Sequence, residues 1–164
     1  MKYDTIIAID PDVDKSGVAE LSPRNRLLDT TNLSFPELLD YLQARKKVSD
    51  VAHTSLAIVV EAGWLNRSNW HLKNKDNARV ASAKGNSTGR NHETGHKIVE
   101  MARHYGMKVI EQRPLQKIWS GRDGKITHKE LASFTGLEGR TTQDERDAAL
   151  LAWEFAGLPI KLKG

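Results

Sequence analysis

Apolar residues are distributed along this chain in two ways, as short continuous runs and as helically spaced positions. Continuous runs over 3–10 and 55–61 are typical of strands that are buried on both faces of a sheet. Returning strands are predicted over 17–21 and 25–33, because Pro, Gly, Ser and Asn residues form turns before each of them. The first three strands are therefore expected to form an antiparallel meander, and 107–111 adds a short fifth strand.

Three of the predicted helices begin at a Ser or Thr that is followed by Glu three residues later. In such a capping box the hydroxyl and the carboxylate each bind a backbone N–H of the first turn. A fourth helix is predicted over about 91–105 from its apolar stripe, with Gly106 as its C-cap. The capping pairs are Ser34 with Glu37, Thr127 with Glu130, and Thr142 with Glu145. The apolar stripe of the first helix is formed by Leu38, Leu39, Leu42 and Val48.

The later strands alternate with helices, whereas the first three strands do not. Alternation predicts parallel strands joined by helical crossovers, and short connections predict antiparallel neighbours. The chain is therefore predicted to be an α/β protein with a mixed five-stranded sheet, in which three antiparallel strands are followed by parallel crossovers, and with helices on both faces. Its 164 residues suit a single domain, 1–164.

Residues 63–90 show no clear period and are rich in Asn, Lys, Ser and Gly. A segment of this length without secondary structure is uncommon in a compact domain, so we expect a long functional loop. Between Trp64 and Lys97, seven Lys and Arg residues are opposed only by Asp76 and Glu93. This excess attracts polyanions such as nucleic acid, although a solvated loop explains it equally well. The seven are Arg67, Lys73, Lys75, Arg79, Lys84, Arg90 and Lys97.

Composition excludes several classes of protein. The chain has no cysteine, which excludes disulfides and zinc–thiolate sites. No stretch approaches the roughly 20 consecutive apolar residues that span a bilayer, so no membrane association is expected. A strand begins within the first few residues, so no signal peptide is predicted and a cytoplasmic location is the default expectation. The formal net charge of +4 is moderately basic.

An acidic residue follows each of the two most apolar strands, and two more acids lie near the C-terminus. Asp10 ends the first strand and Glu61 ends the fourth. If these strands are parallel neighbours, both acids lie at the edge where open α/β sheets form their sites. Asp144 and Asp147 are three residues apart in the last helix and therefore share one face of it. The helix can complete a cluster of four carboxylates.

Four carboxylates so close together would raise one another's pKa values unless cations neutralise them. Mg²⁺ prefers carboxylate oxygen, and two ions roughly 3.5–4 Å apart would clamp the attacking and leaving oxygens of a phosphodiester. The pattern therefore favours Mg²⁺-dependent phosphoryl chemistry. Structural alternatives exist, because Asp144 also suits the positive end of a helix and Asp10 before Pro11 also suits a turn. Glu61 is harder to explain in this way, since strands disfavour Glu.

These motifs, taken in order, resemble the RuvC Holliday-junction resolvases of the RNase H-like superfamily. The run Ile6–Pro11 with Gly17 resembles the family's first strand, its Asp-Pro-Gly turn and the glycine of its second strand. Val59–Glu61 resembles the strand that carries the second acid, and 106–111 resembles the strand after the central helix. Asp144–Leu150 resembles the C-terminal Asp-x-x-Asp-Ala signature. The resemblance extends over nearly the whole chain and implies an RNase H-like fold.

The resemblance also implies an activity, that of a crossover junction endodeoxyribonuclease in DNA recombination and repair. Such an enzyme is a homodimer that binds a four-way DNA junction and nicks two strands symmetrically with Mg²⁺, for which Mn²⁺ substitutes. The acids Asp10, Glu61, Asp144 and Asp147 would be its catalytic residues and would hold two metal ions per active site.

Nucleic-acid contacts are implied at residues outside the acid cluster. Trp64 lies where the family carries an aromatic residue that stacks into the opened junction, and core packing is the alternative role. Lys117 and Lys129 match two basic residues that contact phosphate near the scissile bond, and Lys125 competes for the second position. The basic segment adds Arg67, Lys73 and Lys75 to this predicted set.

Other functions remain open because the chain departs from the family pattern in two places. Asp12 stands where glycine is usual, and the segment 63–90 is longer than its counterpart. The alternatives are an RNase H-like nuclease that acts on another branched DNA or on RNA, and a non-catalytic nucleic-acid-binding protein of the same fold. The string His92–His96 also matches the His-Glu-x-x-His pattern of zinc proteases, but Gly95 lies inside it and no convincing third ligand follows.

Overall fold

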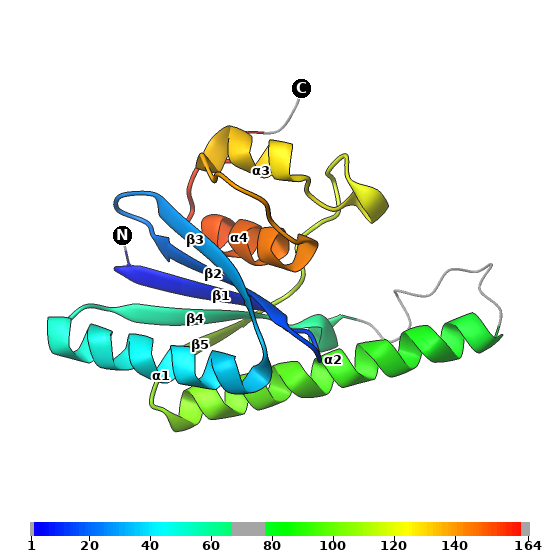
Figure 1. The fold of residues 1–164 in the computed structure, drawn as a ribbon, viewed down its shortest axis with the longest axis horizontal. Coiled ribbons are helices and arrows are strands. Elements are labelled where there is room, and N and C mark those ends of the chain that lie inside the picture. Colours follow the sequence, from blue (N-terminus) through cyan, green and yellow to red (C-terminus); the bar gives the residue numbers. More distant parts are fainter. Residues whose placement is uncertain (1, 67–77, 162–164) are drawn as a thin grey trace.

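The computed structural model describes residues 2–66 and 78–161, and it has helices on both faces of a five-stranded sheet (Figure 1). The strands are β1 (Thr5–Asp10), β2 (Ser16–Ser22), β3 (Leu27–Leu33), β4 (Leu56–Glu61) and β5 (Lys108–Gln112). The α-helices are α1 (Phe35–Ala52), α2 (Ala78–His104), α3 (His128–Thr135) and α4 (Gln143–Phe155). Short 3₁₀ turns lie at Gly63–Leu65 and Arg122–Gly124.

The order of strands in the sheet is β3-β2-β1-β4-β5. The first three strands pair antiparallel through short connections, whereas β4 is parallel to β1 and β5 is parallel to β4. Parallel pairing needs a crossover connection, which α1 supplies before β4 and α2 supplies before β5. The predicted α/β class and the mixed five-stranded sheet with helices on both faces are confirmed.

Alternate residues of the central strands pack into two separate cores. Ile6 and Ala8 of β1 and Val59 of β4 pack with α4, while Ile7 and Ile9 pack with α1 and α2. Figure 1 shows α1 and α2 along one face of the sheet and α4, with α3 beyond it, on the other. Side chains alternate between faces along a strand. Asp10 at the end of β1 lies on the same face as Ile6 and Ala8, and Glu61 at the end of β4 lies on the same face as Val59, so both acids are directed toward α4.

The start of α2 differs from the prediction, since the helix begins at Ala78 and not near residue 91. The predicted loop over 63–90 is therefore wrong from residue 78 onward, and 67–77 lie outside the described residues. The first part of α2 extends beyond the sheet in Figure 1, and its buried residues begin only at Gly95. No apolar stripe marks this part of the helix in the sequence, because it packs on no core.

The predicted helix caps are found where the sequence placed them. Thr127 and Glu130 form a complete capping box at α3. The side chains of Ser34 and Thr142 accept hydrogen bonds from the backbone N–H three residues later at the starts of α1 and α4. The predicted stripe of α1 is only partly correct, because Val48 is 55% exposed; the buried positions of α1 lie in its first half.

Within the described residues, no helix combines the length and apolar character needed to cross a membrane.

Candidate metal centre

Asp10 and Glu61 lie side by side at the ends of β1 and β4. The two strands are parallel with Ile9 opposite Val60, so the residues that follow reach the same edge of the sheet. Because the two carboxyl groups are such close neighbours, the negative charge of Glu61 raises the pKa of Asp10.

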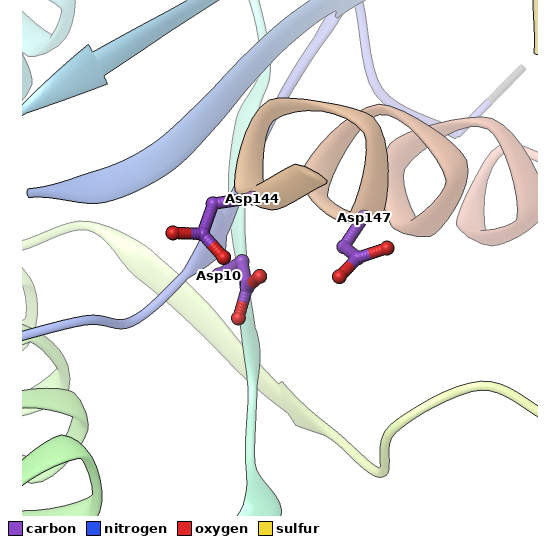
Figure 2. A group of neighbouring side chains, drawn as sticks. All are labelled: Asp10, Asp144 and Asp147. Atoms are coloured by element: carbon purple, nitrogen blue, oxygen red, sulfur yellow. The ribbon is translucent and has the colours of Figure 1, made fainter. Parts of the chain in front are cut away.

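The first turns of α4 bring Asp144 and Asp147 to the same edge. Both come from one face of the helix and point toward Asp10 (Figure 2). One carboxylate oxygen from each of these three residues lies within 4.8 Å of the other two. Among the residues that the structure describes, no other three acidic or histidine side chains lie close enough together to share one metal ion. All four predicted acids line a single pocket.

Gly17 allows α4 to approach the sheet at this point. It pairs with Asp10 across β1 and β2, and a Cβ atom at residue 17 would lie 2.1 Å from the carbonyl oxygen of Asp144. Real Cβ atoms essentially never come so close to a backbone atom. The missing side chain therefore lets the backbone of the first helical turn rest directly on β2, next to the strand that carries Asp10.

The protein environment disfavours the charged forms of these acids. Burial is the largest cause of the shift at Asp10, followed by the charge of Glu61 and then by the two acids of α4. Together they raise the pKa of Asp10 well above its usual value. Burial likewise raises the pKa values of Glu61 and Asp144. A divalent cation among these oxygens would lower these pKa values again, because its charge favours the ionised carboxylates.

Lys125 supplies positive charge to the cluster. Its Nζ lies 3.6 Å from Oδ2 of Asp147. Burial, the largest influence on the Lys125 pKa, lowers it, but the charges of the four acids together outweigh burial and raise the pKa. One lysine cannot neutralise four carboxylates. The excess of negative charge and the purely oxygen-based ligands fit Mg²⁺ or Mn²⁺, which prefer carboxylate oxygen.

The predicted phosphate-binding lysines are placed differently. Lys117 and Lys125 line the pocket that contains the four acids, whereas Lys129 is exposed in the first turn of α3 and is not a lining residue. The structure thus brings Lys125, the competing position, to the acids. Three further predicted nucleic-acid-binding residues, Arg67, Lys73 and Lys75, lie outside the described residues.

Trp64 is packed against α2. Its Nε1 donates a hydrogen bond to Oε1 of Glu111 at 3.0 Å, and its ring centroid lies 4.2 Å from that of His96. A Cβ on Gly95 would lie 2.4 Å from the indole. These contacts give Trp64 a packing role, while the same residue also lines a second pocket with Asp10 and Glu61. Its stacking on a nucleic-acid base stays a prediction.

The His92–His96 string does not assemble a zinc site in the described part of the chain. The His96 ring packs against Trp64 at a tilt of 34°, and His92 meets the same indole edge-on with ring centroids 6.1 Å apart. No group of three metal-ligating side chains within residues 2–66 and 78–161 includes either histidine. The histidines instead help to hold the 3₁₀ turn after β4 against α2.

Two residues beside the acids, Asn91 and Gln143, were not singled out from the sequence. Asn91 lines the pocket, accepts a hydrogen bond from the Val13 N–H at 3.0 Å and so ties the loop after β1 to α2. Gln143 donates to Oδ1 of Asp147 at 2.8 Å. Asn and Gln are common on surfaces, and only their position beside the acids distinguishes these two. Asp12, which the sequence marked as a departure from the family pattern, also lines the pocket, and its charge contributes to the raised pKa of Asp144.

The raised pKa of Asp10 predicts how stability depends on pH in the metal-free protein. The folded-state pKa of Asp10 lies above the usual 3.8. Protonated Asp10 therefore contributes its full share of stability below about pH 3.8, and this contribution is lost as the pH rises through the folded-state pKa. An uncharged amide at this position avoids this loss. We expect Asp10→Asn to stabilise the metal-free protein, and the gain in unfolding free energy to be larger near pH 8 than near pH 5. Urea unfolding with a chelator at both pH values measures this difference; a gain that shrinks with pH would contradict the assignment.

Comparison with known proteins gives a likeness in structure only. No family model matches the chain, and no curated protein matches its sequence. RuvC of Thermus thermophilus in complex with a Holliday junction substrate is 17% identical over 90% of this chain and 89% of that chain, with a TM-score of 0.43. Another structure of Thermus thermophilus RuvC is 16% identical over 93% and 96% of the two chains, also with a TM-score of 0.43.

Proposed function

We propose that this single-domain protein is a RuvC-like, Mg²⁺-dependent endonuclease that resolves four-way DNA junctions. The observation that carries the proposal is the convergence of four acids from β1, β4 and α4 in one pocket. Three of them have carboxylate oxygens close enough to share one ion. Burial makes the ionised forms of these acids energetically unfavourable unless cations are bound. The DNA-junction substrate is supported by the order of sequence motifs described above.

The residues of the pocket divide the work of hydrolysis between them. Asp10, Asp144 and Asp147 would hold metal, and Glu61 would add the fourth carboxylate, giving enough negative charge for two divalent ions. Mg²⁺ held by these acids would supply a lowered pKa for an attacking water and stabilisation of charge on the departing 3′ oxygen. Lys117 and Lys125 line the same pocket and would attract the phosphate that is to be cleaved.

A homodimer follows from the symmetry of the proposed substrate. A four-way junction must be nicked in two strands to be resolved, and the described residues of one chain contain one acid cluster of this kind. Two copies related by a two-fold axis would present two such clusters to the two strands. The proposal therefore includes a dimer that makes paired, symmetric cuts.

A cleavage assay with three substrates tests the proposal. With Mg²⁺ or Mn²⁺, a labelled four-way junction should yield paired nicks at symmetric positions, whereas a flap and an RNA–DNA hybrid should be cut more slowly. Preferential cleavage of the hybrid or the flap would show that the fold acts on another substrate. If calorimetry detects no uptake of Mg²⁺ or Mn²⁺, the protein is instead a non-catalytic nucleic-acid-binding protein.

A further inference from the structure

Gln143, the first residue of α4, connects the acid cluster to the segment that carries Lys125. Its Nε2 donates to Oδ1 of Asp147 at 2.8 Å and to the carbonyl oxygen of Ile126 at 3.1 Å. A glutamine amide nitrogen has two hydrogens. Both are therefore used, one on an acid of the candidate metal centre and one on the backbone next to Lys125.

Arg146 determines the orientation of that amide. Its Nη2 donates to Oε1 of Gln143 at 2.9 Å, and its Nε donates to the same carbonyl oxygen of Ile126 at 3.1 Å. Its Nη1 donates to the carbonyl oxygen of Thr141 at 2.7 Å. A flipped amide would direct its NH₂ group at the guanidinium and its oxygen at the carboxylate of Asp147. Both contacts would be repulsive, so only the observed orientation fits.

These bonds hold both oxygens of one carboxylate. Oδ1 of Asp147 is bound by Gln143, and Oδ2 faces Lys125 at 3.6 Å. The segment behind Lys125 is itself anchored, because two side chains of α4 donate to the carbonyl oxygen of Ile126. The start of α4 and the Lys125 segment are therefore joined into one unit, and the carboxylate cannot rotate without breaking a hydrogen bond.

We propose that Gln143 is a positioning residue of the metal centre, which keeps the Asp147 carboxylate turned toward the shared ion and Lys125 beside it, with Arg146 holding the amide in the required orientation. This role rests on the proposed metal-dependent function. Groups that hydrogen-bond to metal-binding carboxylates orient them, and losing such a partner costs about 10–100-fold in metal affinity or activity.

The variant Gln143→Met tests this role, because methionine has similar length but donates no hydrogen bond. We expect Mg²⁺ affinity, measured by calorimetry on the initially metal-free protein, to fall about 10–100-fold. In the junction assay kcat should fall with little change in KM, and raising Mg²⁺ should restore part of the rate. Gln43→Met is the matched control, since Gln43 is exposed on α1, and it should bind Mg²⁺ as the wild type does.

A second variant separates positioning from simple loss of folding. Arg146→Lys keeps the positive charge of the helix but replaces the three donor nitrogens that bind Gln143, Ile126 and Thr141 with a single one. The amide of Gln143 is then held less firmly but is still present, so this variant should lower Mg²⁺ affinity less than Gln143→Met does. If both variants bind Mg²⁺ as tightly as the wild type, the positioning role is wrong and the proposed function stands. If the wild type itself takes up no Mg²⁺, the proposed function fails, and the positioning role fails with it.

Discussion

Asp10→Asn should abolish Mg²⁺-dependent cleavage of a four-way junction while leaving the protein folded. The charges of the three other acids all raise the pKa of Asp10, which shares its edge of the sheet with Glu61. A neutral amide at this position binds a divalent cation poorly. A loss of about 4 kcal/mol of metal-dependent stabilisation in the transition state corresponds to about a 10³-fold loss of rate. Single-turnover cleavage at saturating Mg²⁺ measures this loss.

The same variant should also lose the effect of Mg²⁺ on stability. Ligands that bind only the folded state raise its stability, so added Mg²⁺ should raise the melting temperature of the wild type. We expect no such increase for Asp10→Asn, whereas Asp40→Asn, on an exposed residue of α1, should respond as the wild type does. Cleavage by Asp10→Asn at the wild-type rate would show that the acid cluster is not the catalytic site.

Among substitutions that add one methyl group to the sheet, Gly17→Ala should destabilise the protein most. The added Cβ would lie 2.1 Å from the carbonyl oxygen and 2.2 Å from the carbonyl carbon of Asp144. These are backbone atoms of a helix, which cannot move aside as a flexible side chain can. Overpacking of this kind typically costs about 1–3 kcal/mol. Moving α4 away from β2 would also separate Asp144 from Asp10, so we expect weaker Mg²⁺ binding as well as a lower melting temperature.

Gly85→Ala is the control for this prediction. Gly85 lies inside α2, and a Cβ there would meet no atom within 4 Å. Replacing an exposed helical glycine by alanine should stabilise the helix by about 0.5–1 kcal/mol. Opposite signs for the two Gly→Ala variants in urea unfolding are the expected result. If Gly17→Ala is as stable as the wild type and binds Mg²⁺ equally well, α4 does not rest on β2 in the way described.

The strands and the helix starts were predictable because their signals are local. A continuous apolar run such as 55–61 satisfies the needs of a strand buried on both faces, whatever else the chain does. Capping pairs such as Thr127 with Glu130 bind the backbone within a single turn. The first half of α2 was not predicted, because a helix that packs on no core has no apolar period and this one contains Gly85 and Gly89.

The candidate site was predictable to a different extent for each residue. Asp10 and Glu61 follow apolar strands, where a carboxylate is conspicuous because it is costly to bury. Lys125 and Gln143 have no such signal, since Lys and Gln are ordinary in loops and at helix starts. The predicted Lys129 lies four residues beyond the lysine that reaches the acids, and spacing along a loop could not distinguish between the two.

By itself, the sequence determined the α/β class, the strand-end acids and the capped helices, because each depends on interactions within a few residues. The tertiary structure alone decided which face of the sheet the acids occupy. A strand turns alternate side chains to opposite faces, and only the packing of α4 on one of them, through Gly17, brings Asp144 and Asp147 to Asp10. It also selected Lys125 as the neighbouring cation and Gln143 as the group that orients Asp147, because both contacts join segments that folding brings together.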